Sequence, residues 1–211
     1  MYEDQKKELL DICQQMVEND LVIGSSGNAS LRVDENVVIS PSSVHYTEMS
    51  TDDIVVVDMN GDVIEGTRNP SIEMPMHLEI YAARDKALAI VHTHSIYASA
   101  MAVMQEPLPP ILDEIIPKLG ATIRVSSYAM PGTKDLAKNV VEVLESRSAA
   151  LIANHGAVCY AKSLKEALFL SIVLERACKI YMTAKCAGKV NELPEEVVED
   201  EQDIWEMMSQ Y

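Results

Sequence analysis

Aromatic residues are scarce in this sequence of 211 residues, which contains one Phe, one Trp and eight Tyr. Aliphatic side chains therefore have to build most of any core. Basic residues are scarce as well, with 17 Lys and Arg against 33 Asp and Glu and a net charge of −16. Much of the acidic excess lies in residues 195–206, where we expect a solvated helix face. A surface that neutralises phosphates presents clustered Lys and Arg, so neither nucleic acid nor an anionic membrane is an expected partner.

Long hydrophobic runs and paired cysteines are missing too. No apolar run approaches the ~18 residues of a transmembrane helix, and residues 1–20 carry too many charges for a secretory signal. The cysteines, Cys13, Cys159, Cys178 and Cys186, form no C-x-x-C pair, so we expect reduced thiols packed as small apolar groups. Together these features predict a cytoplasmic protein.

The chain length suits one sizeable core better than two, so we expect a single domain over residues 1–211. Apolar residues recur at helical spacing over residues 9–17, and alternating patterns then predict hairpins over 29–39 and 54–64. Further on, helices and strands alternate. The expected helices cover 73–84, 96–104, 133–147, 163–186 and 194–208, and the expected strands 88–91, 123–125 and 149–153. This order predicts an α/β fold, three-layer αβα with a mixed, largely antiparallel central sheet.

Three of the five histidines are expected at the ends of strands. His92 and His94 lie two residues apart, so their side chains project from one face and their imidazoles can converge on one cation. His155 follows another apolar strand, between Asn and Gly. An isolated H-x-H pair is often only polar surface, but the third histidine in an equivalent position favours a metal site.

Glu73 is the candidate for a fourth ligand, because it opens a predicted helix. Taken alone, an ordinary first-turn carboxylate is the simpler interpretation. His77 lies four residues later on the same helix face, so it is either a ligand or, as we favour, a donor that orients Glu73. His45 follows a loop and is interpreted as a surface residue.

Small and hydroxyl-bearing residues cluster in loops that can form a phosphate-binding concavity. The segment Gly24 to Asn28 offers exposed backbone N–H groups in one turn, although a plain tight turn before a strand explains it equally well. The candidate substrate- or phosphate-binding residues are Ser25, Gly27, Asn28, Ser42, Ser43 and Ser71.

Six short motifs in order make the chain resemble the class II aldolase and adducin family, in particular its fuculose-phosphate aldolase branch. They are Gly27-Asn28-Ala29-Ser30, Ser40-Pro41-Ser42, Pro70-Ser71-Ile72-Glu73, His77-Leu78-Glu79-Ile80-Tyr81, Val91-His92-Thr93-His94-Ser95 and Asn154-His155-Gly156. The resemblance covers almost the whole chain. It implies a mixed sheet flanked by helices and a fourfold-symmetric homotetramer with sites between subunits. It also implies one divalent cation per subunit on the three histidines, zinc first and manganese or iron as alternatives.

The activity that the resemblance implies is cleavage of a ketose 1-phosphate to dihydroxyacetone phosphate and a short aldehyde, with Glu73 displaced from the metal to shuttle the proton. A sugar-acid phosphate decarboxylase and a pentulose-5-phosphate 4-epimerase fit the same template, although the related epimerases carry Asp in place of Glu73. Two further alternatives are a non-catalytic adducin-like interaction module and a closed structural metal site. The retention of three histidines and Glu73 argues against the module.

The sequence departs from the family pattern at three places. Phosphate-binding members usually carry Thr-Gly where this chain has Ser42-Ser43, and Ser where it has Ile72. Fuculose-phosphate aldolases place a tyrosine acid near the position of Leu112-Asp113-Glu114. We therefore hypothesise that Asp113 or Glu114 acts as the acid or contacts the substrate. Tyr211 at the C-terminus is another candidate for a residue that reaches the active site.

Overall fold

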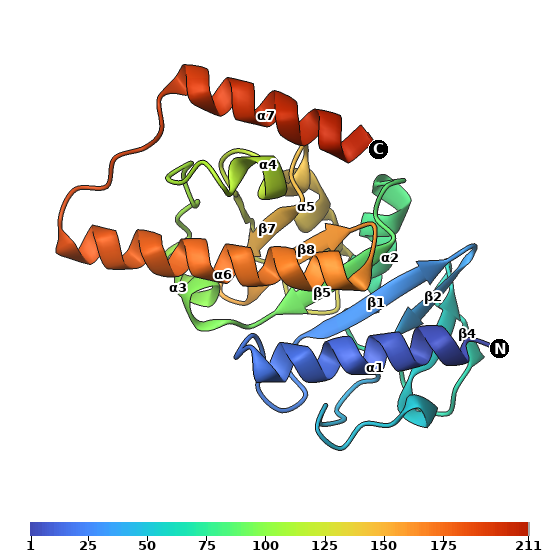
Figure 1. The fold of residues 1–211 in the computed structure, drawn as a ribbon. Helices are drawn as coiled ribbons and strands as arrows, with labels where there is room; N and C mark the ends of the chain where they lie inside the picture. Colours follow the sequence, from blue (N-terminus) through green and yellow to red (C-terminus); the bar gives the residue numbers. More distant parts are fainter. Residues whose placement is uncertain (211) are drawn as a thin grey trace.

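The computed structural model describes residues 1–210, which form one mixed eight-stranded sheet with helices on both faces (Figure 1). The strands are β1 (Asn28–Val33), β2 (Asn36–Ile39), β3 (Val55–Asp58), β4 (Val63–Glu65), β5 (Ala89–Thr93), β6 (Val125–Ser126), β7 (Ala149–Ile152) and β8 (Gly156–Ala161). Their spatial order is β4-β3-β2-β1-β5-β8-β7-β6. Only the β6–β7 pair is parallel, so the predicted mixed, largely antiparallel sheet is confirmed.

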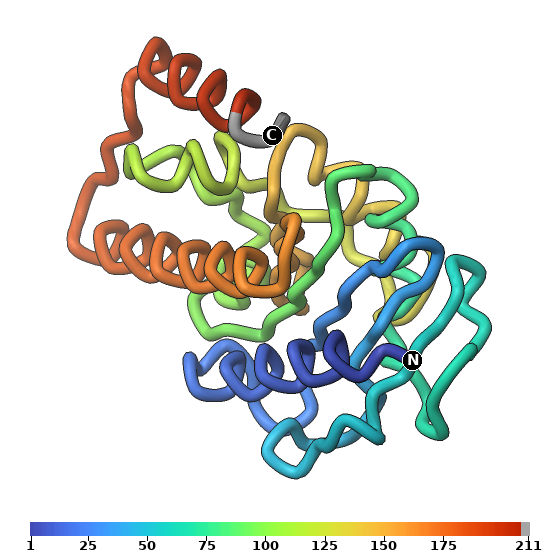
Figure 2. Tube along the Cα trace, turned by 45° about the vertical axis from the view of Figure 1, so that its right-hand side comes forward, coloured from blue at the N-terminus to red at the C-terminus, as the bar shows by residue number. Residues whose placement is uncertain are grey.

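The helices form a layer on each side of the sheet. They are α1 (Glu3–Glu18), α2 (Met74–Ala83), α3 (Ile96–Met104), α4 (Ile116–Leu119), α5 (Lys134–Leu144), α6 (Leu164–Ala187) and α7 (Glu195–Gln210), with a short 3-10 turn at Thr51–Asp53. Side chains of α1, α3 and α6 share one hydrophobic cluster with the sheet, and those of α2 and α5 share the other. The turned view in Figure 2 keeps α1 and α6 on the same side of the sheet. The predicted three layers are confirmed.

Two helices begin where the sequence places their caps. The Thr133 hydroxyl accepts the Leu136 N–H at 3.2 Å, and the Ser163 hydroxyl accepts the Glu166 N–H at 3.2 Å. Each bond satisfies a backbone donor that the first helical turn leaves free. Helix α5 ends at Leu144, three residues before the end at residue 147 that the sequence predicts.

The strand β8 and the helix α4 were not predicted. All six residues of β8 are buried, because helices cover the sheet on both faces, and a strand buried on both faces lacks the alternation that marks a half-exposed strand. Helix α4 is a single turn, too short for a periodic signal. The predicted strand over 123–125 is shifted, since β6 covers Val125–Ser126 and Ile123 forms only an isolated bridge with Leu108.

The cysteine prediction holds for three of the four residues. Cys13, Cys159 and Cys178 are buried free thiols, whereas Cys186 is a free thiol exposed near the end of α6. None of the helices within residues 1–210 combines the length and the apolar character that a bilayer crossing requires.

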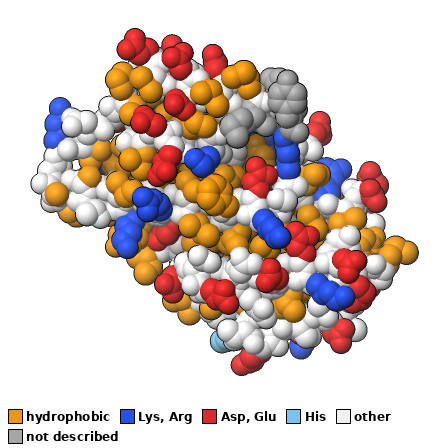
Figure 3. Space-filling view, viewed as in Figure 1, with side chains coloured by type: hydrophobic (Ala, Val, Ile, Leu, Met, Phe, Trp, Pro, Cys, Tyr) orange, Lys and Arg blue, Asp and Glu red, His pale blue; other side chains and the backbone are white. Residues whose placement is uncertain are grey.

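The acidic C-terminal helix α7 docks through a narrow apolar face. Its Trp205 is 8% exposed and donates from Nε1 to the Ser148 hydroxyl at 3.1 Å, while most of the acidic side chains of α7 are exposed, as predicted. Figure 3 shows acidic side chains along the top of the molecule, where α7 lies. The helix packs on α4, at the sheet end that carries β6 and β7.

Trp205→Ala is expected to lower the free energy of unfolding by about 3 kcal/mol, since truncating a buried Trp leaves a cavity and an unpaired hydroxyl. Denaturant titration followed by circular dichroism measures the change. Ile204→Ala is the matched control because Ile204 is 39% exposed. Equal shifts in the two variants would contradict docking through Trp205.

Candidate metal centre and substrate pocket

The strand β5 positions two of the three histidines. His92 is fully buried within β5 and lies between Asn28 of β1 and Val158 of β8 in the sheet register. His94 lies just beyond the strand, which ends at Thr93. The strand therefore runs two residues farther than predicted. Backbone pairing on both sides fixes His92 where a loop residue would be free to move.

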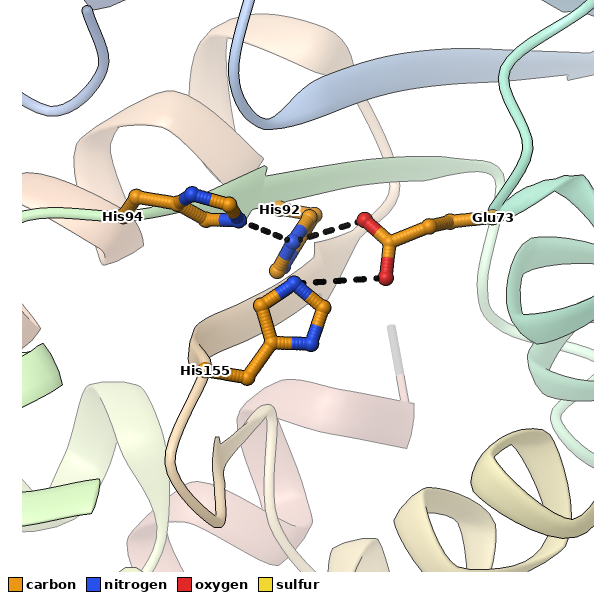
Figure 4. A group of neighbouring side chains, drawn as sticks. All are labelled: Glu73, His92, His94 and His155. Carbon is orange, nitrogen blue, oxygen red and sulfur yellow. Dashed lines mark hydrogen bonds and ion pairs between the residues drawn. The ribbon is translucent and has the colours of Figure 1, made fainter. Parts of the chain in front are cut away.

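Glu73 and His155 approach the same point from two other segments. Glu73 is the N-cap residue of α2 and is only 4% exposed. His155 lies in the turn between β7 and β8, where Asn154 adopts a positive φ of 56°. Because β8 pairs with β5, this turn returns beside the histidines of β5. Figure 4 shows the four side chains converging on one point.

The four side chains are close enough to share one cation. Each pair of imidazole centroids is 4.8 Å apart. His92 Nε2 lies 2.9 Å from His94 Nε2 and 2.9 Å from Glu73 Oε2, and His155 Nε2 lies 3.4 Å from Glu73 Oε1. One ligand atom from each residue falls within 4.8 Å of the others.

The hydrogen bonds around the cluster show that its ligand atoms suit a cation. His92 Nδ1 lies 2.9 Å from the Ala157 carbonyl, which can only accept, so Nδ1 carries a proton and Nε2 of the neutral ring has a free lone pair. That lone pair faces the Glu73 carboxylate and His94 Nε2. Glu73 Oε1 is buried and has no hydrogen-bond partner among the described residues. Three imidazole nitrogens and a carboxylate oxygen are the ligands of catalytic zinc and similar divalent ions.

The electrostatics of the cluster favour the ligand forms of Glu73, His94 and His155. Burial by itself raises the pKa of the Glu73 carboxyl, but the charge of His92 and their hydrogen bond outweigh burial and hold that pKa well below its ordinary value. Burial and the charge of His92 lower the pKa of His94 to about 3, and burial lowers the pKa of His155 to about 4. Burial opposes protonation of His92, but Glu73 outweighs it and raises the pKa of that imidazole. The site thus pairs a negative carboxylate with a position that attracts positive charge.

A polar cavity of about 300 Å³ opens beside the cluster. Glu73, His94 and His155 line one part of it, and small residues from three loops line the rest. All six residues predicted for substrate or phosphate binding are among them, namely Ser25, Gly27, Asn28, Ser42, Ser43 and Ser71. The structure therefore brings the predicted binding loops and the metal-ligating residues together in one pocket.

The loop before β1 reaches the pocket because glycine allows a close approach. Gly27 has a φ of +69°, and a Cβ built there would lie 2.6 Å from the His92 carbonyl oxygen. A side chain at this position would push the loop away from β5. On the opposite wall, Gly132 with a φ of +78° packs on the Ile72 carbonyl and brings Pro131 into the lining. Pro131 was not predicted, and only the Pro-Gly turn signalled a loop there.

Asp113 and Glu114 do not line this pocket. Both are exposed in the segment before α4, and Glu114 Oε1 lies 3.7 Å from Arg176 Nε. Within one chain the structure does not bring them to Glu73, and their role toward the substrate stays a prediction. Tyr211 lies outside the described residues.

His77 lies outside the cation cluster, and its Nε2 contacts Asn28 Oδ1, so it reaches Glu73 through Asn28 and not directly. Its Nδ1 contacts Ser30, which in turn contacts the Tyr81 hydroxyl, and neither Ser30 nor Tyr81 was predicted as part of the site. Tyr81 follows His77 by four residues, and that helical spacing was the available signal.

His45 behaves as predicted and is exposed. Its imidazole lies over the backbone of the loop that leads into the pocket, near Gly24. Its side chain lines neither the cavity nor the cation cluster as described.

Residues 7–182 match the family model of the class II aldolase and adducin N-terminal domain, and the chain belongs to this family. A 5-deoxy-D-ribulose 1-phosphate aldolase of Bacillus thuringiensis serovar kurstaki is 35% identical over 202 residues, 95% of this chain and 94% of the relative. The L-fuculose phosphate aldolase of Escherichia coli K12 is 31% identical over 177 residues, 84% and 82% of the two chains. A solved structure of an L-fuculose 1-phosphate aldolase superposes with a TM-score of 0.92 at 40% identity, covering 96% of each chain.

The activity class follows from the relatives and the site together. The relatives are aldolases, and the cluster of Glu73, His92, His94 and His155 supplies a place for a metal ion. The chain is accordingly a metal-dependent aldolase, a lyase of carbon–carbon bonds.

Proposed function

We propose that this enzyme cleaves a ketose 1-phosphate to dihydroxyacetone phosphate and a short aldehyde, with zinc as the native cation and manganese or iron as alternatives. One observation carries the proposal. The same cavity is lined by the cation-binding side chains Glu73, His94 and His155 and by the serine- and glycine-containing loops that suit a phosphate. A substrate with a carbonyl two bonds from its phosphate ester spans these two parts of the pocket.

The names of the relatives suggest three candidate substrates, the 1-phosphates of a 5-deoxyribulose, a 5-methylthioribulose and a fuculose. A 5-deoxyribulose 1-phosphate has five carbons, so removing the three of dihydroxyacetone phosphate leaves acetaldehyde, and a fuculose 1-phosphate has six and leaves lactaldehyde. A relative in Rhodospirillum rubrum is a 5-methylthioribulose-1-phosphate/5-deoxyribulose-1-phosphate aldolase, 30% identical over 191 residues that cover 90% of this chain and 86% of the relative. Similarity alone does not rank the candidates, because the 5-deoxyribulose 1-phosphate aldolase aligns over 95% of this chain at 35% identity and a fuculose 1-phosphate aldolase covers 96% of it at 40%.

The proposed chemistry assigns a proton to Glu73. A bound divalent cation supplies a Lewis acid for the carbonyl and hydroxyl oxygens of the substrate. The carbon–carbon bond breaks as the hydroxyl that becomes the aldehyde loses its proton, and the bonding electrons stay on the other fragment as an enediolate. Glu73, after taking a proton from water, delivers it to that carbon and completes dihydroxyacetone phosphate, while the proton of the cleaved hydroxyl passes to another base and on to water. The small-residue loops hold the phosphate so that the reacting carbon stays near Glu73.

We further propose a fourfold-symmetric homotetramer with sites between subunits, as the family resemblance implies. In this assembly Asp113 or Glu114 of the partner subunit handles the proton of the substrate hydroxyl. The exposure of both carboxylates supports their availability to another chain. A cytoplasmic location is supported by four free thiols, which reducing compartments preserve.

Condensation tests the proposal directly. Metal-reconstituted protein is incubated with dihydroxyacetone phosphate and either acetaldehyde or lactaldehyde, and ketose phosphates are identified by mass spectrometry and NMR. We expect a new ketose phosphate with at least one aldehyde, and the faster reaction identifies the preferred substrate. If no ketose phosphate formed with either aldehyde while one metal ion per chain was bound, the result would contradict the aldolase activity and favour the decarboxylase.

Ser42→Ala is expected to raise KM for dihydroxyacetone phosphate about tenfold or more and to leave kcat nearly unchanged, because a hydrogen bond to a charged group contributes about 1.5–3 kcal/mol. Steady-state kinetics of condensation measures both constants. Thr67→Ala is the control, since Thr67 is exposed and does not line the cavity. A loss of kcat at unchanged KM would place the phosphate elsewhere.

A further inference from the structure

A buried chain of hydrogen bonds runs from the Glu73 carboxylate into the core. Asn28 Nδ2 lies 3.0 Å from Glu73 Oε2, and Asn28 Oδ1 lies 2.5 Å from His77 Nε2. His77 Nδ1 lies 2.6 Å from the Ser30 hydroxyl, which is 2.7 Å from the Tyr81 hydroxyl. All five side chains are buried, and those of Ser30, His77 and Tyr81 are fully so.

Two regular elements interleave to build this chain. Glu73, His77 and Tyr81 follow one another at four-residue intervals along one face of α2. Asn28 and Ser30 lie two residues apart on β1, so both point to the same face of the sheet. Within the chain, each hydrogen bond therefore joins a residue of α2 or its N-cap to a residue of β1. The hydrogen bonds therefore fix the register of α2 against β1.

Each hydrogen bond in the chain has one possible direction. The Glu73 carboxylate only accepts, so the Asn28 amide nitrogen faces it and the Asn28 oxygen faces His77. His77 Nε2 must then donate, and since burial lowers the pKa of His77 to about 3, the ring is neutral and its Nδ1 accepts. The Ser30 hydroxyl consequently donates to Nδ1 and accepts from the Tyr81 hydroxyl. Every donor points toward Glu73.

The chain ends on one oxygen of the carboxylate only. Glu73 Oε2 accepts from Asn28 and lies 2.9 Å from His92 Nε2, whereas Oε1 lies 3.4 Å from His155 Nε2 and has no hydrogen-bond partner among the described residues. The Asn28 amide therefore fixes the rotation of the carboxylate through Oε2 alone.

We propose that Tyr81, Ser30 and His77 are positioning residues that fix the orientation of the Asn28 amide and thereby hold the Glu73 carboxylate in the orientation that proton transfer requires. The inference rests on the proposed aldolase function, because it assigns a role within proton transfer by Glu73. Without His77, the Asn28 amide is free to rotate and to present its oxygen to the carboxylate, which repels it and disturbs the aim of Glu73.

Exchange of the substrate proton with solvent isolates this step. Dihydroxyacetone phosphate is incubated with metal-loaded enzyme in D₂O without aldehyde, and the loss of the C–H signal at the carbon bearing the free hydroxyl is followed by NMR. His77→Leu is expected to slow the maximal exchange rate by about 10–100-fold, the usual effect of removing a partner that orients a metal-site group. KM and metal content per folded chain are expected to stay close to those of the wild type.

Rescue separates positioning from mere packing. His77→Gln keeps a side-chain N–H near the position of Nε2 and is expected to recover most of the exchange rate. The Gln side chain differs in shape from an imidazole as much as Leu does, so recovery reports the N–H and not the packing. Tyr81→Phe and Ser30→Ala are small enough to fold if His77→Leu does not, and both are expected to slow exchange at unchanged KM. Tyr160→Phe is the control, since Tyr160 is a largely buried tyrosine on β8 outside the chain of hydrogen bonds.

The outcomes test the proposed aldolase function and the positioning role separately. A wild-type enzyme that binds metal and exchanges no proton would overturn the proposed function itself. A wild type that exchanges while Tyr81→Phe, Ser30→Ala and every folded His77 variant exchange equally fast would overturn the positioning role alone. Equal losses in His77→Leu and His77→Gln would also overturn it, because the retained donor would then have no effect.

Discussion

Glu73→Gln lowers kcat for condensation and cleavage by about 10²–10⁴-fold, the usual contribution of a positioned acid–base group. The substitution keeps the shape of the side chain at the start of α2 and removes its charge and its ability to take a proton. The new amide also faces the Asn28 N–H that the carboxylate accepts at 3.0 Å. Steady-state kinetics in both directions, normalised to bound metal, measures the loss.

Glu79→Gln is the matched control for this loss. Glu79 lies on the same helix, is exposed and faces away from the cavity of the cation site. We expect wild-type turnover in this variant. If Glu73→Gln retained more than a tenth of the wild-type kcat with metal bound, another group would have to carry the proton.

His92→Ala reduces metal affinity and turnover by more than about 100-fold, since losing even a residue that only orients a ligand changes affinity or activity by 10–100-fold. His92 is the most constrained of the three histidines, with Nδ1 held by the Ala157 carbonyl at 2.9 Å and its backbone paired on both sides. Its loss also removes the imidazole nitrogen that lies 2.9 Å from Glu73 Oε2. Metal content by plasma emission spectroscopy and kcat per chain measure the two effects.

Treatment with a chelator tests the metal dependence of turnover independently of any substitution. Removal of metal from the wild type is expected to abolish condensation, and added divalent ions are expected to restore it. His45→Ala should keep both metal and activity, because His45 is exposed and is not part of the cluster. Full activity of His92→Ala at one tenth of the wild-type metal content would contradict a metal-dependent role for this histidine.

Much of the site could be predicted because its residues lie in short local motifs. His92 and His94 share an H-x-H pair, His155 lies in a turn, and the loop over Gly24 to Asn28 has a composition with few structural alternatives. The fold class was predictable for the same reason, since most helices and hairpins carry their own period and caps. Helix α3 lies where the pattern placed it, at Ile96–Met104.

The missed features depend on contacts between distant segments. The strand β8 has no alternating pattern because the sheet is covered on both faces, yet it is the strand that returns His155 beside β5. The role of Asn28 between His77 and Glu73 was missed, because helical spacing reports neighbours on α2 and cannot report a residue of β1. The hypothesis that Asp113 or Glu114 acts as the acid came from the family resemblance, and the fold places both on the surface of one chain, away from Glu73.

The pairing of Asn28 with His92 across β1 and β5 limits how such a chain can change in length. Successive residues of a strand face opposite sides of the sheet, so one residue inserted into β1 would turn Asn28 away from the cluster and bring an apolar neighbour to Glu73. The tight turn between β1 and β2, around Asp34 and Glu35, lies at the end of β1 opposite to Asn28. Insertions there leave the register of Asn28 and His92 intact. Length variation compatible with catalysis therefore belongs in the distal hairpins and not in the two strands that carry the site.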